Sequence, residues 1–331
     1  MRVTSLFVAS ALGAFASFQT TVLARSLGST ELQNVLDDTD NAPEYHYPTD
    51  FTREIIPVRS SETADEGHPM RFRESNCDYW RDRPVYSAIA AGCVSIEADV
   101  WLINGTLYVG HHRSSLAETR TLKSLYIDQI VQILKRQNPQ NKFVPSSTRN
   151  GVFDTNPAQT LYLFIDIKTD GVETWKQVSK DLQPLRDLGY LTKVKNGIKI
   201  SAPVTVIGTG NTPLNLITEL ENRDYFYDAP LAELDQPEFD NISSLISPIA
   251  STSFEAAVGA TNQDKEDPLT SAQLETIRAQ IKKANSKGIG ARYWQTPGWP
   301  IRKRNEIWRV LLKEGVALLN VDDLDAVKEY F

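Results

Sequence analysis

The feature that most constrains the fold is a repeated alternation of strand-like and helix-like segments from Met70 onward. Eight short apolar runs occur, and most are followed by a segment with helical periodicity. Eight strands connected through helices over about 260 residues match the count and length of a barrel. We therefore predict an α/β fold, a (β/α)8 TIM barrel that follows an N-terminal extension. The predicted strands are 70–75, 94–102, 160–168, 204–209, 224–228, 245–250, 289–294 and 316–321, and the predicted helices are 83–91, 123–137, 172–189, 213–221, 271–287, 302–314 and 322–330.

The alternative architecture is a doubly wound open sheet, but no glycine-rich phosphate loop follows the first predicted strand. The segment after residues 224–228 lacks a clear helix. Asn104-Gly105 is a strong two-residue turn signal, and it predicts a hairpin between residues 100–103 and 106–110. This hairpin would carry His111 back toward the barrel rim.

The first 24 residues predict a secretory signal peptide. Arg2 precedes an apolar stretch, and Val22 and Ala24 occupy the positions that a signal peptidase reads. Because that stretch is too short to span a bilayer, we expect a secreted protein cleaved near Ala24, with an uncleaved anchor as the alternative. Two sequons, at Asn104 and Asn241, predict glycosylation of an exported chain. The chain is divided into a signal peptide (1–24), an extension (25–69) and the barrel domain (70–331).

The net charge and the few cysteine and histidine residues limit which partners and which reactions the chain can have. The chain has 35 Lys and Arg against 42 Asp and Glu, a net charge of −7, so no nucleic-acid partner is expected. Cys77 and Cys93 would lie at opposite ends of the barrel strands, and we expect them to stay unpaired. The four histidines are His46, His68, His111 and His112.

Three acidic residues predict a metal site inside the barrel. Side chains alternate along a strand, so Glu97 and Asp99 share the face opposite their apolar neighbours. Asp166 interrupts the apolar run of strand 160–168 near its carboxyl end, where barrel enzymes carry catalytic groups. Oxygen ligands alone favour Mg²⁺ or Ca²⁺ over zinc. The alternative is a buried layer of salt bridges with Lys168.

A lysine and a histidine accompany the predicted carboxylates. Lys168 shares a strand face with Asp166 and suits a phosphate oxygen or a developing anion. His111, at the rim, suits the role of nucleophile or general acid–base, with a surface histidine as the alternative. We expect His112 to point away.

Several segments of this sequence resemble a known family. Residues 91–101 (AGCVSIEADVW), residues 107–111 (LYVGH) and residues 120–122 (RTL) look like the fungal family of altered inheritance of mitochondria protein 6. That family belongs to the phospholipase-C-like phosphodiesterase superfamily, whose distant members include glycerophosphodiester phosphodiesterases and spider-venom phospholipases D. The resemblance continues through 164–168, 203–206, 226–231, 292–294 and 321–324, and covers about 70–331.

The resemblance implies attack on a phosphodiester, either by a histidine or by a neighbouring hydroxyl of the substrate. It implies that the three carboxylates bind Mg²⁺, with Ca²⁺ as the alternative, and that His111 is one of two catalytic histidines. Lys168 would be catalytic and lie near the phosphate. The residues expected to bind substrate are Tyr79, Trp80, Arg292 and Trp294.

The chain departs from the family after the first predicted strand. Relatives carry His-Ser-His-Asn-Asp-Tyr-Trp, whereas residues 74–80 read Glu-Ser-Asn-Cys-Asp-Tyr-Trp. Asn76 therefore stands at a catalytic position in place of a histidine, and an amide donates a hydrogen bond but cannot shuttle a proton near neutral pH. A second departure is Gln295, where relatives often carry an acidic residue.

Three functions remain open. The first is a secreted, metal-dependent phosphodiesterase, a hydrolase or lyase, acting on a lipid or small molecule, with possible peripheral contact with lipid. The second is a barrel that binds a phosphorylated, lipid or glycosidic ligand without cleaving it, using rim aromatics that include Tyr293. The third is a tailoring enzyme for a small metabolite, which the scaffold permits.

Overall fold

The computed structural model describes residues 59–61, 81, 83–144, 146, 148–153, 156–261 and 268–330, which form a mixed α/β fold. No helix within these ranges is long and apolar enough to cross a membrane. Cys93 is buried, and its relation to Cys77 stays a prediction. The predicted features that lie outside the described residues are the signal peptide, His46, His68, strand 70–75, Asn76, Cys77, Tyr79 and Trp80.

One sheet forms the centre of the fold. Its strands are β1 (Arg59–Ser61), β2 (Ser95–Ile103), β3 (Thr106–Val109), β4 (Leu161–Ile167), β7 (Val204–Gly210), β8 (Phe226–Tyr227), β9 (Ala229–Pro230), β10 (Ile249–Ser253), β11 (Gly290–Trp294) and β12 (Leu318–Val321). They follow the order β8-β7-β4-β2-β1-β12-β11-β10-β9 with parallel pairing, and β3 adds antiparallel to β2. Only Asp228 separates β8 from β9 in the chain, so the order starts and ends in one short segment, residues 226–230.

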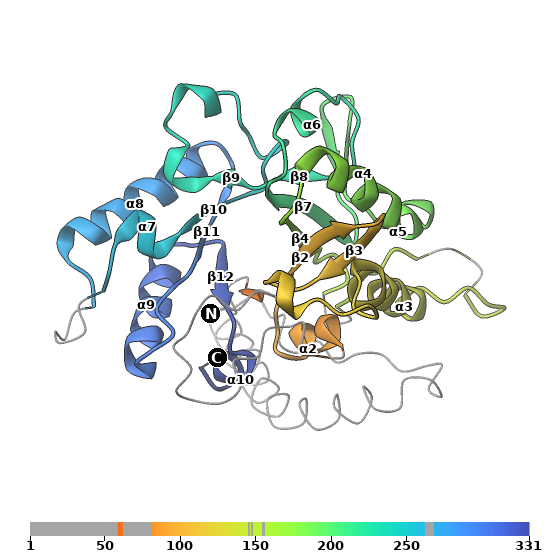
Figure 1. Ribbon diagram of the computed structural model, residues 1–331, viewed down its shortest axis with the longest axis horizontal. Coiled ribbons are helices and arrows are strands. Elements are labelled where there is room, and N and C mark those ends of the chain that lie inside the picture. Colours follow the sequence, from red (N-terminus) through yellow and green to blue (C-terminus); the bar gives the residue numbers. More distant parts are fainter. Residues whose placement is uncertain are drawn as a thin grey trace, which may run out of the picture.

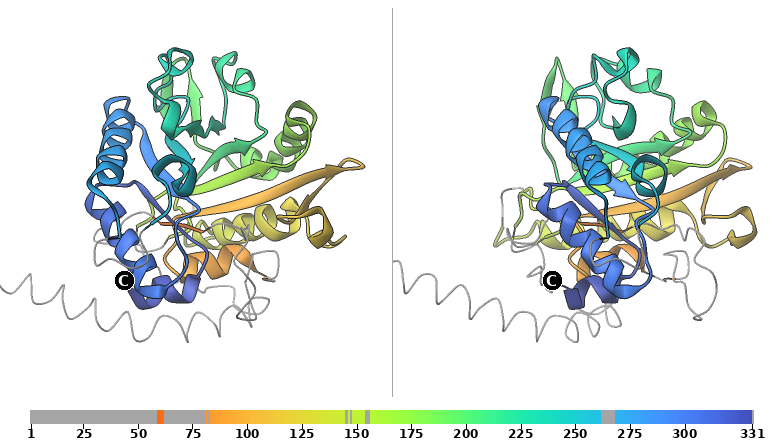
Figure 2. Two further views of the ribbon diagram at one scale, coloured as in Figure 1. Left: turned by 60° about the vertical axis from the view of Figure 1, so that its left-hand side comes forward. Right: turned by 90° about the vertical axis from the view of Figure 1, so that its left-hand side faces the viewer.

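Helices flank this sheet. They are α2 (Pro84–Ala90), α3 (Asp128–Gln137), α4 (Gly171–Asp181), α5 (Gln183–Asp187), α6 (Asn215–Thr218), α7 (Phe254–Val258), α8 (Ser271–Ser286), α9 (Ile301–Lys313) and α10 (Leu324–Tyr330). Figure 1 shows α3, α4 and α5 at one side of the strands and α8 and α9 at the other. Figure 2 shows the long β2–β3 hairpin reaching out from the body of the fold.

Local sequence explains where two long helices begin. The Asp170 carboxylate accepts a hydrogen bond of 2.9 Å from the Glu173 amide and caps α4. Thr270 and Gln273 form a reciprocal capping box at the start of α8. Each cap satisfies backbone amides that have no partner within the helix.

The core lies between the sheet and the helices. Ile96, Ala98 and Val100 on β2 are fully buried, as the alternation predicted for the face toward the helices. The hairpin turn at Asn104-Gly105 is confirmed, with φ angles of 49° and 79° at these two residues. The segment after β8 carries only the short 3-10 helices Leu231–Glu233 and Pro237–Phe239, as its sequence indicated.

The first strand of the sheet comes from an unexpected place. β1 pairs in parallel with β12 and with β2, and it lies within residues 25–69, which we expected to be an extension. Ser60 is the register partner of both Asn320 and Ser95. The extension therefore contributes a strand. The sequence did not predict it, because three residues, 59–61, are too few to show the alternating pattern of a strand.

Two further elements differ from expectation. The strand predicted over 245–250 is displaced, since β10 begins at Ile249; the Ser243 carbonyl accepts hydrogen bonds of 2.8 Å from the Ile246 and Ser247 amides, so the chain turns there. A small hairpin of β5 (Lys193–Lys195) and β6 (Ile198–Ile200) was not predicted. It turns at residues 196–197, another Asn-Gly pair, so the signal that found the first hairpin also marks this one.

Candidate active site

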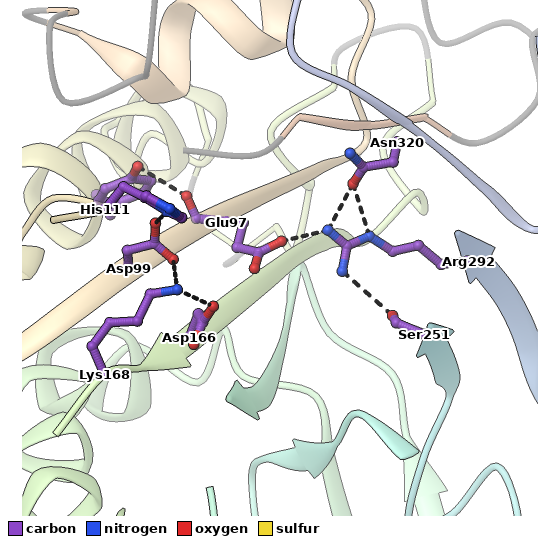
Figure 3. A network of polar contacts seen from close by, with 9 residues as sticks. Glu97, Asp99, His111, Asp166, Lys168, Ser251, Arg292 and Asn320 are labelled. Carbon is purple, nitrogen blue, oxygen red and sulfur yellow. Dashed lines mark hydrogen bonds and ion pairs between the residues drawn. The ribbon is translucent and has the colours of Figure 1, made fainter. Parts of the chain in front are cut away.

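Strands β2 and β4 bring three carboxylates together. In their parallel register Asp99 is paired with Asp166, while Glu97, two residues earlier on the same face, is paired with Phe164. Glu97 and Asp99 are buried and Asp166 is partly buried. One oxygen from each carboxylate lies within 4.8 Å of the others, so these residues could hold a metal ion. Figure 3 shows the three side chains on one side of the sheet.

Lys168, just after β4, lies between two of these carboxylates. Its Nζ is 2.7 Å from Asp166 Oδ2 and 3.2 Å from Asp99 Oδ1. Burial alone would lower the pKa of Lys168, but the charges of Asp99 and Asp166 raise it above its usual value. The ammonium group therefore stays charged and offsets one negative charge of the cluster.

The β2–β3 hairpin places His111 against this cluster. The Gly110 amide donates a hydrogen bond of 3.1 Å to the Asp99 carbonyl, which fixes the backbone beside the imidazole. His111 Nδ1 is 3.3 Å from Asp99 Oδ2, and 12% of the His111 side chain is exposed. His112 is exposed and meets the His111 ring edge-on, with ring centroids 4.4 Å apart. The hairpin thus brings the predicted histidine to the predicted carboxylates.

Arg292, which we expected to bind substrate, does not fit that role in its observed place. Its side chain is 1% exposed and forms an ion pair with Glu97. Nε and Nη2 donate to Asn320 Oδ1 at 3.1 and 2.7 Å. Trp294 shares this strand face and is partly buried, so its predicted contact with substrate stays a prediction.

The aromatic side chain between them points the other way. Tyr293 is fully buried, and its hydroxyl group donates a hydrogen bond of 2.8 Å to Gln280 Oε1 on α8. The expectation that Tyr293 is a rim aromatic is therefore wrong, because strand alternation directs it to the helix layer. Gln295, with a φ of 54°, accepts a hydrogen bond of 2.7 Å from Ser253.

Burial makes the acidic residues of the site hard to ionise. It raises the pKa of Glu97 to about 7, and the charges of Asp166 and Asp99 add to this while Arg292 opposes it. It also raises the pKa of Asp166 to about 6, with Asp99 adding and Lys168 opposing. Such a cluster favours a bound cation, since carboxylates held close in low dielectric repel one another.

A fourth carboxylate, Asp228, was missed by the sequence reasoning. It lies between β8 and β9, and burial raises its pKa to about 6 although Arg292 opposes this. Its Oδ1 atom is buried with no hydrogen-bond partner among the described residues. Ser251 and Asn320, both of which contact Arg292, were missed as well. The available signal for Asp228 and Asn320 was a polar residue inside a strand-like run, as it was for Asp166, whereas Ser251 lies just after the run predicted over 245–250.

The donor set fits a hard divalent cation. In the described part of the site, four carboxylates face the two cationic side chains Lys168 and Arg292, so full ionisation of the carboxylates would leave two negative charges without compensation. Glu97, Asp99 and Asp166 would hold such an ion through oxygen atoms, the ligands that Mg²⁺ and Ca²⁺ prefer.

Comparison with known proteins gives a consistent family. Residues 49–228 match the AIM6-like phosphodiesterase domain. A homolog of altered inheritance of mitochondria protein 6 from Arthroderma benhamiae is 54% identical over 310 residues, which cover 92% of this chain and 93% of the relative. Altered inheritance of mitochondria protein 6 from Eremothecium gossypii is 35% identical and covers 77% of this chain and 68% of the relative.

Among solved structures, a glycerophosphoryl diester phosphodiesterase from Parabacteroides distasonis is similar with a TM-score of 0.40 and 13% identity, over 85% of this chain and 90% of that one. Altered inheritance of mitochondria protein 6 from Saccharomyces cerevisiae is 32% identical and covers 85% of this chain and 76% of the relative. The extent of the sequence matches and their agreement on one domain show that the chain belongs to the AIM6-like phosphodiesterase family.

Proposed function

We propose that this protein is a secreted, metal-dependent phosphodiesterase that acts on a phosphodiester of a lipid or a small molecule. The observation that carries the proposal is the contact between His111 and Asp99 within the three-carboxylate cluster, in a chain of the AIM6-like phosphodiesterase family. A phosphodiesterase needs a cation near the phosphate and a group that moves a proton or attacks phosphorus. The cluster and the histidine offer one candidate for each.

The scaffold that we propose is the (β/α)8 barrel. Its support is the parallel strand order that starts and ends in residues 226–230, with α-helices in most of the connections between parallel strands. In such a barrel the carboxyl ends of the strands form the active-site face. Asp166 and Trp294 lie near the carboxyl ends of β4 and β11, in keeping with that face. Asp99 lies within β2 and is the register partner of Asp166.

We propose Mg²⁺ as the resident ion, with Ca²⁺ as the alternative. A bound divalent ion would neutralise phosphate charge and polarise the phosphoryl group. Asp99 orients His111 by accepting a hydrogen bond from Nδ1–H, which leaves Nε2 as the atom that attacks or takes up a proton. Lys168, held between Asp99 and Asp166, keeps a positive charge on the side where substrate oxygens would approach.

The chain carries Asn76 at a position where relatives carry a histidine. Either a hydroxyl group of the substrate or Glu74 would have to supply what a second histidine supplies in relatives. A barrel that binds a phosphorylated, lipid or glycosidic ligand without turnover is the competing function, and a tailoring enzyme for a small metabolite is another. Both competitors keep the metal cluster and lose the hydrolytic step.

A turnover assay separates these functions. Purified chain, treated with chelator and reloaded with Mg²⁺ or Ca²⁺, is offered a panel of glycerophosphodiesters, lysophospholipids and an aryl phosphodiester. The proposal expects product formation that disappears with chelator and returns with the ion. Asn76→His should raise the rate, because a general acid–base contributes about 10²- to 10⁴-fold. Absence of ion-dependent turnover in both the wild type and this variant would refute the proposal.

Secretion, glycosylation and lipid contact are part of the proposal. Both sequon residues, Asn104 and Asn241, are exposed and so are accessible to a glycosyltransferase. Trp299 and Ile301, in the segment that follows β11, are 64% and 52% exposed. Exposed apolar side chains of this kind suit shallow contact with a lipid surface. Weaker vesicle binding by Trp299→Ala, at unchanged turnover of a soluble phosphodiester, would support lipid contact.

A further inference from the structure

Arg292 is held by three strands at once. Its Nη2 atom pairs with Glu97 Oε2 on β2 and donates to Asn320 Oδ1 on β12. Its Nη1 atom donates to Ser251 Oγ on β10 at 3.3 Å. Its Cζ atom lies over the Phe164 ring, 4.7 Å from the ring centroid. Figure 3 shows Glu97 between this group and the other two carboxylates.

These contacts determine what Arg292 can do. With 1% of its side chain exposed, it cannot reach a substrate in solution, so any effect on chemistry must pass through a neighbour. The neighbour with a role in the site is Glu97, whose Oε2 atom it engages. A carboxylate has two oxygens, and Oε1 is the one that a metal ion could take without breaking the pair.

We infer that Arg292 is a positioning residue of the metal centre, which holds Glu97 by one oxygen so that the other faces Asp99 and Asp166 with a fixed geometry. This inference rests on the proposed metal-dependent function. Hydrogen-bonded partners of metal ligands orient those ligands, and their loss typically lowers metal affinity about 10- to 100-fold. The Asn320 and Ser251 contacts and the Phe164 ring hold the guanidinium itself in place.

The positioning role makes a prediction that a purely structural role does not. If Arg292 acts through Glu97, its removal matters to the ion only while Glu97 is a ligand. If it merely stabilises the fold, its loss should change the free energy of unfolding and leave metal affinity unchanged. If its positive charge were mainly a repulsive neighbour of the ion, its removal would tighten metal binding.

The test measures Mn²⁺ binding by titration calorimetry on the full chain after chelation. The variants are Arg292→Met, Arg292→Lys, Glu97→Gln and the double variant Glu97→Gln with Arg292→Lys. Arg292→Lys keeps the charge but not the planar fork, so it guards against a Met variant that does not fold. Arg186→Met is the matched control, because Arg186 forms a two-bond pair with Asp224 away from the cluster.

We expect both Arg292 variants to bind Mn²⁺ about 10- to 100-fold more weakly, with Arg186→Met unchanged. Adding Arg292→Lys to Glu97→Gln should weaken binding no further. Unchanged or tighter binding by a folded Arg292 variant overturns the inference alone, and so does an additive loss in the double variant. A wild-type chain that binds no Mn²⁺ overturns the metal centre itself and this inference with it.

Discussion

His111 and His112 are adjacent in the chain but differ in their contacts, which makes them a natural pair for mutation. His111 lies 3.3 Å from Asp99 and is mostly buried, whereas His112 is exposed. We expect His111→Asn to lower phosphodiesterase turnover by about 10²-fold or more, because no other described histidine contacts the cluster. His112→Asn should stay close to wild type. Equal losses in the two variants would show that the loop, not the imidazole of His111, matters.

Asp228 predicts a pH dependence of stability. Its pKa is raised to about 6 by burial, so the folded chain binds a proton more tightly than the unfolded chain does. Its contribution to stability is therefore greatest at low pH and decreases as pH rises from about 4 to 6. Asp228→Asn cannot ionise at this position. We therefore expect its free energy of unfolding, relative to that of the wild type, to rise across that pH range by at most about 3 kcal/mol.

Urea denaturation of metal-free protein at pH 4.5 and at pH 7.5 measures this difference. At each pH, the free energy of unfolding of the wild type is subtracted from that of Asp228→Asn. The prediction concerns how this difference changes between the two pH values. Asp240→Asn, at an exposed acidic residue, is the control and should show no such change. The assignment of Asp228 as a buried acid is contradicted if this difference in free energy of unfolding is the same at both pH values, or if the wild type is relatively more stable at pH 7.5.

At the residue scale, the alternation of side chains along single strands predicted the acidic residues of the site. It did not predict that Arg292 pairs with one of them, Glu97. Glu97, Asp99 and Asp166 could be found because a charge on one face of an apolar strand is visible within a few residues. Arg292 lies 195 residues from Glu97 in the chain, and nothing local indicates that the two meet. The sequence therefore predicted the carboxylates of the site but assigned its buried cation to the substrate.

At the element scale, the end of β7 is tied to the site by a glycine. Gly210 has a φ of 61°, and a Cβ atom there would come within 2.0 Å of Asp166 Oδ1. Gly210→Ala should therefore displace the Asp166 carboxylate, in addition to the cost of a left-handed conformation, about 1–2 kcal/mol for a residue with a side chain. We expect a larger loss of stability than that figure and weaker Mn²⁺ binding.

Gly189 provides the matched control for this experiment. It has a φ of 71°, and a Cβ atom there would meet nothing within 4 Å. Gly189→Ala should therefore lose about 1–2 kcal/mol from backbone conformation alone and bind Mn²⁺ like the wild type. Urea denaturation and calorimetry of both variants check this. Equal metal affinity in the two variants would mean that β7 does not set the position of Asp166.

Element boundaries show where sequence reasoning ends. The two Asn-Gly turns carry a local signal, and both form hairpins, although only the one at 104–105 was used. The position of β10 had no such signal, because its residues are small and hydroxyl-bearing while the more apolar Leu245 and Ile246 precede the strand. The position of β10 in the chain is determined by its pairing with β11, and pairing partners cannot be read from a single sequence.

At the scale of the whole molecule, the sheet depends on the segment before the predicted domain boundary. β1 is the strand between β12 and β2, and its residues 59–61 lie ahead of position 70. Without β1, an edge of β2 and an edge of β12 would both lose their parallel partner. The fold therefore extends into residues that composition alone assigned to an extension.

Two truncated chains test this dependence. A chain that begins at residue 54 keeps β1, and one that begins at residue 70 lacks it. We expect the first to unfold cooperatively with a midpoint close to that of the chain from residue 25. The second should lose several kcal/mol, because backbone hydrogen bonds along two strands are exposed to water and the buried ends of β2 and β12 lose cover. Thermal unfolding followed by circular dichroism measures both. An unchanged midpoint for the chain from residue 70 would mean that the predicted strand 70–75 supplies the missing pairing, and that the boundary at residue 70 is the right one.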